Sequence, residues 1–130
     1  ATLAAIATAI VALSSSPRFK TAIAALESAL AQVMAMRPVS FEYVEPGPMQ
    51  DGPQVGFIAE EAMEVDPRLV VLDKDGQPLG FRYGQYTALL TKALQEQQAQ
   101  IDRLSMTVDV LTQALAHVLT PQEVEGQYSR

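Results

Sequence analysis

Three consecutive serines, residues 14–16, precede Pro17 in the stretch ALSSSPRFKTAI, and Lys20 follows a few positions later. A serine hydroxyl is a useful nucleophile only when a neighbouring group accepts its proton. A lysine can accept that proton if burial or a nearby cation lowers the pKa of its ammonium group. The same residues are also typical of a helix start, with Ser16 as the N-cap and Pro17 at the first helical position. Composition alone leaves both interpretations open.

The remaining chemistry-bearing residues are few. The chain has a single histidine, His117, and no cysteine. One histidine cannot by itself form a zinc site or offer a serine triad a choice of partners. Without cysteine the sequence provides neither a thiolate nor a disulfide. It also contains no metal cluster, phosphate loop or cofactor fingerprint, so we expect no metal, no cofactor and no small-molecule substrate.

Glu60 and Glu61 are adjacent carboxylates that could suggest acid–base chemistry. Neighbouring positions on a helix, however, point about 100° apart. We therefore expect both to be structural, lining a contact between chains or forming ion pairs with Arg37, Arg68 or Arg82.

Length and composition indicate one small domain that associates with copies of itself. The 130 residues carry a formal net charge of −6 and are 48% hydrophobic, the size of one domain. Aromatic residues make up only 6%, and much of the apolar content is alanine. A single chain would therefore bury a thin core, which favours oligomerisation. The acidic balance argues against binding to nucleic acid or to a membrane surface, and no segment reaches the roughly 18 apolar residues of a membrane span.

The first 85 residues predict an upstream segment followed by a small mixed body. Residues 1–14 place apolar side chains at helical spacing without a preceding basic residue, and we interpret them as the end of a longer upstream segment rather than as a signal peptide. Residues 18–36 predict a helix, and residues 39–45 alternate like a strand. A strand followed by a helix is expected at 54–65 and a hairpin at 68–84, and both predicted helices stop at a proline.

From Tyr86 onward the pattern becomes one long helix. Its apolar residues alternate spacings of four and three over four heptads, which is a strong coiled-coil signal. The alternative, an amphipathic helix packed on its own domain, usually shows a wider apolar face. We predict a coiled coil over residues 86–119 and a flexible tail over residues 120–130. Tyr83 and Tyr86 are expected to anchor the root of the helix.

The predicted coiled-coil seam contains one polar residue. Position a holds Leu94, Ile101, Val108 and Leu115, and position d holds Leu90, Gln97, Leu104, Leu111 and Val118. Leucine and β-branched residues are mixed at both positions, so this chemistry does not decide between two strands and three. Gln97 would fix the register at some cost in stability.

Several pieces of the sequence, taken in order, match a known pattern. They are SSPRFKTAI, RPVSFEY, VGFIAEEAMEVDPRLV and DGQPLGFRYGQYTALLTKALQEQQAQI. Together they resemble the C-terminal intramolecular chaperone domain of phage tail spikes and fibres, the endosialidase type, from about Ser15 to Leu104. The resemblance implies a domain that trimerises the fibre subunits, helps the upstream β-structure to fold, and then cuts itself off just before a motif serine.

The resemblance assigns roles to individual residues. The motif serine is Ser15 and the motif lysine is Lys20, so the bond at risk is Ser14–Ser15, and Arg18 takes the motif arginine position. The spacing suits a contact if Ser15 lies just before the predicted helix and Lys20 in its first turn. The amides of that turn could then stabilise an oxyanion.

Three positions depart from the family pattern. The acid that follows the motif serine is Ser16 here, and the asparagine near the lysine is Ala22. Many relatives carry a histidine where this chain has Gln54. The loss of the acid puts the rate of cleavage in doubt if that acid orients the serine or the lysine.

We therefore expect an α+β fold, with a body over residues 15–85 and a trimeric coiled coil. The function expected is that of a detachable folding clamp on an upstream spike or fibre of the same chain. It would act in the host cytoplasm during phage assembly and leave its upstream product in the virion tail. A non-cleaving trimerisation cap retained in the particle remains open. So does a coiled-coil adaptor that binds host proteins through residues 105–120.

Overall fold

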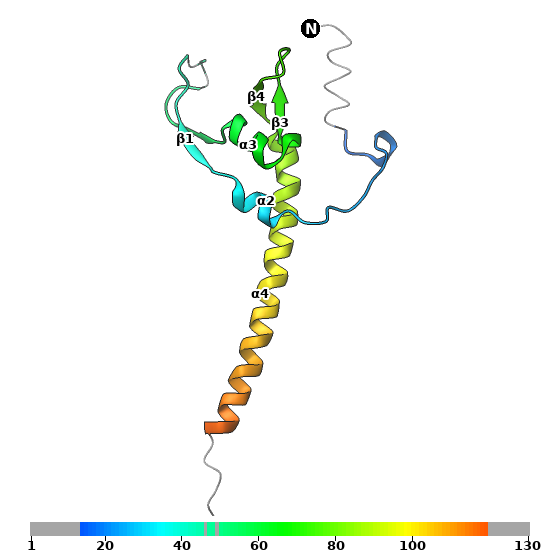
Figure 1. Cartoon of the computed structure of the whole chain (residues 1–130), viewed down its shortest axis with the longest axis vertical. Coiled ribbons are helices and arrows are strands. Elements are labelled where there is room, and N and C mark those ends of the chain that lie inside the picture. Colours follow the sequence, from blue (N-terminus) through cyan, green and yellow to red (C-terminus); the bar gives the residue numbers. More distant parts are fainter. Residues whose placement is uncertain (1–13, 46, 49, 120–130) are drawn as a thin grey trace, which may run out of the picture.

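The computed structural model describes residues 14–45, 47, 48 and 50–119. A small body of short helices and hairpins lies at one end of a long helix, which extends away from it (Figure 1). The α+β class with a long C-terminal helix is therefore confirmed. In chain order the elements are η1 (Pro17–Phe19), α2 (Leu30–Ala35), β1 (Val39–Phe41), β2 (Gln54–Gly56), α3 (Ala59–Val65), η2 (Pro67–Leu69), β3 (Val70–Leu72), β4 (Pro78–Phe81) and α4 (Tyr83–Leu119).

Strands β1 and β2 pair antiparallel, with Val39 opposite Gly56. A Cβ on Gly56 would lie 2.5 Å from the Tyr83 hydroxyl oxygen and 3.2 Å from the Phe41 ring. A larger residue here would have to displace the Tyr83 side chain, so glycine leaves room for the aromatic ring at the root of α4. The strand predicted over residues 39–45 is shorter than expected: it ends at Phe41, and Tyr43 beyond it is exposed.

Strands β3 and β4 form the predicted hairpin, with Val70 opposite Phe81. Its turn is built by Asp73, whose Oδ1 accepts hydrogen bonds from the amides of Asp75 and Gln77 at 2.8 and 2.9 Å. Gly76 completes the turn at φ 79°, a conformation that side chains with a Cβ disfavour. The turn is therefore stabilised by hydrogen bonds among its own residues.

Helix α3 ends where the sequence predicted, before Pro67. Asp66, only 4% exposed, then caps η2 by accepting the Arg68 amide and also binds the Arg68 guanidinium through both oxygens. This hydrogen bonding, together with the charge of Arg68, lowers the pKa of Asp66 although its burial acts in the opposite direction.

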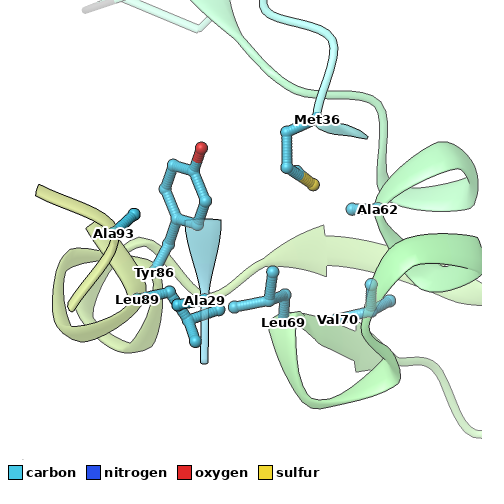
Figure 2. Close-up of a cluster of buried hydrophobic side chains, with 8 residues drawn as sticks. All are labelled: Ala29, Met36, Ala62, Leu69, Val70, Tyr86, Leu89 and Ala93. Atoms are coloured by element: carbon cyan, nitrogen blue, oxygen red, sulfur yellow. The ribbon is translucent and has the colours of Figure 1, made fainter. Parts of the chain in front are cut away.

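The core is thin, as the composition predicted. Among the residues that the structure describes, the one large side chain buried to less than 2% exposure is Leu69, at 1%. Figure 2 shows Tyr86, Leu89 and Ala93 of α4 beside the residues that the body contributes. Phe57, Phe81, Tyr83 and Tyr86 pack as aromatic rings around the root of α4, which agrees with the expected anchoring by both tyrosines. The buried apolar residues are Ala29, Met36, Ala62, Leu69, Val70, Tyr86, Leu89 and Ala93.

The helix predicted over residues 18–36 is wrong for most of its length. The chain forms only the turn η1, runs without regular structure through residues 20–29, and becomes helical from Leu30. Ala22 has φ 51°, which interrupts a right-handed helix. Along this stretch Ile23 is 69% exposed. A helix here would therefore gain nothing by burying its apolar stripe, and propensity alone does not stabilise a short helix.

Helix α4 begins at Tyr83, three residues before the expected start at Tyr86. Its first turns pack on the body through Tyr86, Leu89 and Ala93. From residue 97 to Leu119 every residue of the helix is exposed. The alternative of a helix packed on its own domain therefore holds only for the first turns of α4.

Candidate functional site

The serine–lysine pair expected from the sequence is in contact. Lys20 Nζ donates a hydrogen bond to Ser15 Oγ at 3.0 Å. This is the distance at which one group can pass a proton to the other. A local turn of the chain therefore brings the two side chains together without help from the rest of the body.

The turn that creates this contact is η1. The Ser16 hydroxyl oxygen accepts the Arg18 amide at 3.3 Å, and Pro17 occupies the first helical position. The Lys20 amide then donates to Pro17 O at 3.2 Å, which closes a tight turn of the 3₁₀ type. Ser16 is thus an N-cap as predicted, but the element that it caps is this three-residue turn and not the helix expected over residues 18–36. A single turn of three residues has too few aligned amides to act as the oxyanion site expected from a full helix.

Arg18 lies beside the pair. Its Nε donates to Ser16 Oγ at 3.1 Å, and its guanidinium carbon lies 5.4 Å from the centre of the Phe19 ring. In this chain a neutral hydroxyl therefore occupies the position where the family pattern has an acid. Since that hydroxyl contributes no negative charge, the charge of Arg18 is not neutralised by residue 16.

The other three candidate residues do not reach Ser15 within one chain. Gln54 lies in β2, where its Nε2 donates to Gly52 O. Glu60 and Glu61 lie in the first turn of α3. In Figure 1 the segment of η1 and the labelled elements β1 and α3 lie on opposite sides of α4.

Glu61 has one of the ion pairs that the sequence suggested. Both of its carboxylate oxygens accept hydrogen bonds from Arg37. The pKa of Glu61 is lowered, first by this hydrogen bond and then by the charge of Arg37, and the pKa of Arg37 is raised correspondingly. Glu60 is exposed on the same helix. The adjacent carboxylates thus have different surroundings, as expected of structural residues.

The predicted seam residues share one exposed face of α4. Leu90 is the first seam residue along α4 and is 41% exposed. Leu94, one turn further from the body, is 65% exposed. The remaining apolar members of the seam, all exposed, are Ile101, Leu104, Val108, Leu111, Leu115 and Val118. A continuous apolar face of this length on a single helix is typical of an interaction surface.

Sequence reasoning missed Glu96, which joins α4 to α2. Its carboxylate accepts the amides of Ala29 and Leu30 at 3.1 and 3.0 Å and the hydroxyl of Ser28 at 3.2 Å. These are the free donors at the start of α2. The pKa of Glu96 is lowered, most strongly by the Leu30 amide. No local pattern could have indicated this contact, because the partners are more than 60 residues apart in the chain.

No metal site or membrane span accompanies this arrangement in the part of the chain that the structure describes. Within it, no group of three or more His, Cys, Asp or Glu side chains is placed to hold a metal ion. None of its helices is long and apolar enough to cross a bilayer.

Comparison with known families agrees with the geometry. Residues 15–71 match the family described as chaperone of endosialidase. The match begins at Ser15, the expected motif serine, and ends within β3, earlier than the expected Leu104. No curated protein matches the chain. The family resemblance expected from the sequence is therefore confirmed over residues 15–71.

Proposed function

We propose that the chain is an intramolecular chaperone that holds three copies of an upstream spike or fibre together and then releases itself by cleavage at Ser14–Ser15. The observation that carries the catalytic part is the 3.0 Å contact between Lys20 Nζ and Ser15 Oγ, located at the first residue of the family match. Its place of action would be the host cytoplasm during phage assembly, with the upstream product kept in the virion tail.

The proposed reaction is an attack on the chain's own backbone. Ser15 Oγ passes its proton to the uncharged amine of Lys20 and attacks the carbonyl carbon of Ser14. The C–N bond breaks as Lys20 returns the proton to the Ser15 nitrogen, which leaves Ser14 esterified to Ser15 Oγ. Water then hydrolyses the ester, so the upstream chain ends in a Ser14 carboxylate and the chaperone begins at Ser15. Because both reactants belong to one chain, no substrate binding is required.

The exposed face of α4 supports the assembly part of the proposal. Three parallel copies would bury this face against one another and hold three upstream chain ends together. Joining chain ends in this way raises their effective concentration, so that slow non-local β pairing upstream starts from aligned chains. Cleavage afterwards would make folding kinetically irreversible, because the clamp is then no longer covalently attached.

A reporter domain fused upstream of Ala1 tests the catalytic part. We expect release of the reporter, with a C-terminal fragment whose mass corresponds to a start at Ser15. Ser15→Ala should abolish release. Lys20→Arg should abolish it too, because arginine keeps the positive charge and can donate to Ser15 Oγ but cannot lose its proton in a protein.

The matched control is Ser14→Ala, which alters the same serine run but keeps the nucleophile and the lysine. It should release the reporter at a rate close to that of the unmodified chain. Equal release from Ser15→Ala, or full activity of Lys20→Arg, would contradict the proposed chemistry.

A non-cleaving trimerisation cap is the second candidate, and one observation favours it. Ser16 replaces the acid of the family pattern, and its hydroxyl is already bonded to Arg18. If the acid is essential, the pair is inactive and the domain stays in the particle. Mass spectrometry of the purified full-length protein distinguishes the two candidates: an intact chain indicates the cap, and a fragment beginning at Ser15 indicates the self-releasing chaperone.

A further inference from the structure

Gln97 is the polar member of an otherwise apolar seam. Along α4 it lies between Leu94 and Ile101, both exposed members of the same face. Its polar neighbours on the helix have other partners. Glu96 binds the start of α2, and Gln98 donates to Asp102 at 2.8 Å. In an assembled seam, Gln97 is thus the amide that would be enclosed by apolar layers.

A buried amide must find partners for every donor and acceptor, because leaving one unpaired costs about 1–3 kcal/mol. A glutamine side chain has two N–H donors and one carbonyl oxygen. In a ring of three Gln97 side chains, each oxygen can accept one N–H from the next chain. Each amide then keeps a second N–H, so three donors remain around the threefold axis.

We propose that, in the trimer, the three Gln97 side chains bind one small anion such as chloride on the axis of the coiled coil. Each oxygen also keeps a second lone pair, but a carbonyl oxygen with one partner is tolerated, whereas an unpaired buried N–H is rare. The three N–H groups therefore need an acceptor, and one small anion can accept from all three. The seam residues above and below, Leu94 and Ile101, supply no competing charge. The charged residues of this part of α4 lie outside the seam, at Lys92, Glu96, Asp102 and Arg103.

This site rests on the proposed trimer, since each copy supplies one third of it. The position of the Gln97 ring along α4 also suggests what the ring would do in the trimer. Glu96, the neighbour of Gln97, fixes the start of α2 and thereby the arm of residues 20–29 that leads to Ser15 and Lys20. A slip of one heptad would displace one arm from another by about 10 Å. A ring that is satisfied only when three Gln97 side chains are level would therefore keep the three arms level.

Chloride dependence of trimer stability tests the site. The full 130-residue chain is first shown to be a trimer by sedimentation equilibrium, and unfolding is then followed at constant ionic strength while chloride replaces gluconate, which is too large for the ring. For one anion per trimer, each tenfold rise in chloride above its Kd should lower the unfolding equilibrium constant about tenfold. Gln97→Leu should be more stable and should lose this dependence.

Bromide provides a direct second measurement. Crystals of the trimer grown in bromide should show an anomalous scattering peak on the threefold axis, level with Gln97. A water molecule in that place, or a chloride dependence equal in Gln97→Leu, overturns the anion site while the proposed function stands. A chain that sediments as a monomer overturns both.

Discussion

At the scale of single residues, the site depends on a short turn and on one unusual backbone conformation. Ser15 and Lys20 are in contact because η1 folds the four residues between them into one tight turn. Ala22, two residues later, then directs the chain away at φ 51°. An L-residue with a Cβ is disfavoured there by about 1–2 kcal/mol, whereas asparagine tolerates the conformation. The backbone conformation of residue 22 thus offers an explanation for the asparagine that the family pattern has at this position.

We predict that Ala22→Asn stabilises the arm by about 1 kcal/mol. The effect should be visible in hydrogen exchange of the Lys20 amide, which donates to Pro17 O and so reports on the turn. Slower exchange is expected in the variant. Ala24→Asn is the control, since Ala22 is the one residue other than glycine with positive φ in the described part of the chain. Equal slowing in both variants would contradict the prediction.

At the scale of elements, sequence patterns predicted the helices and strands whose formation depends on interactions within the segment itself. The hairpin of β3 and β4 carries its own turn residues, α3 stops at a proline, and α4 shows its periodicity over many turns. The arm of residues 20–29 was not predictable in this way. Its helical pattern is overridden by the conformation of Ala22, and the start of α2 is fixed by Glu96 from far along the chain. A pattern within one segment contains no information about such a partner.

We predict that Glu96→Gln lowers Tm by a few degrees and weakens the response of Tm to acid. The pKa of Glu96 is lowered in the folded chain, chiefly by the Leu30 amide, from an ordinary value of 4.5. Its contribution to stability is therefore present above pH 4.5 and is lost as the pH falls through the lowered pKa. Below that range the two proteins should melt at similar temperatures.

Thermal melts followed by circular dichroism between neutral and acid pH measure this difference. Asp66 and Glu61 also have lowered pKa values, but they are present in both proteins and cancel in the comparison. Glu64→Gln, which changes an exposed carboxylate of α3, is the matched control. If it reproduces the loss, the effect is one of net charge and not of the contact with α2.

At the scale of the whole molecule, the single chain leaves a long apolar face of α4 uncovered by the other described residues. Its core is small, and every residue of α4 from 97 to Leu119 is exposed. The same chain keeps the segment of η1 on the opposite side of α4 from β1 and α3 (Figure 1). The residues that the heptad pattern assigned to the seam are exposed on α4, and a pattern of this kind is local enough to be read from the sequence. The number of copies depends on how three or two such faces fit together, which neither the pattern nor one chain determines.

Two apolar residues of α4 that a single chain exposes to a similar extent should respond differently to a charge. Leu104 is 65% exposed and belongs to the seam, whereas Met106 is 68% exposed and lies on the outer face. In a monomer, lysine at either position would be solvated to the same extent. In the proposed trimer, Leu104→Lys would bury three like charges on the axis, while Met106→Lys would keep its charge in water. We expect Leu104→Lys to sediment as a monomer and Met106→Lys as a trimer. Reporter release should slow with Leu104→Lys alone, since assembly precedes cleavage in the proposed order. Identical behaviour of the two variants would show that this face of α4 is not the one through which the copies associate.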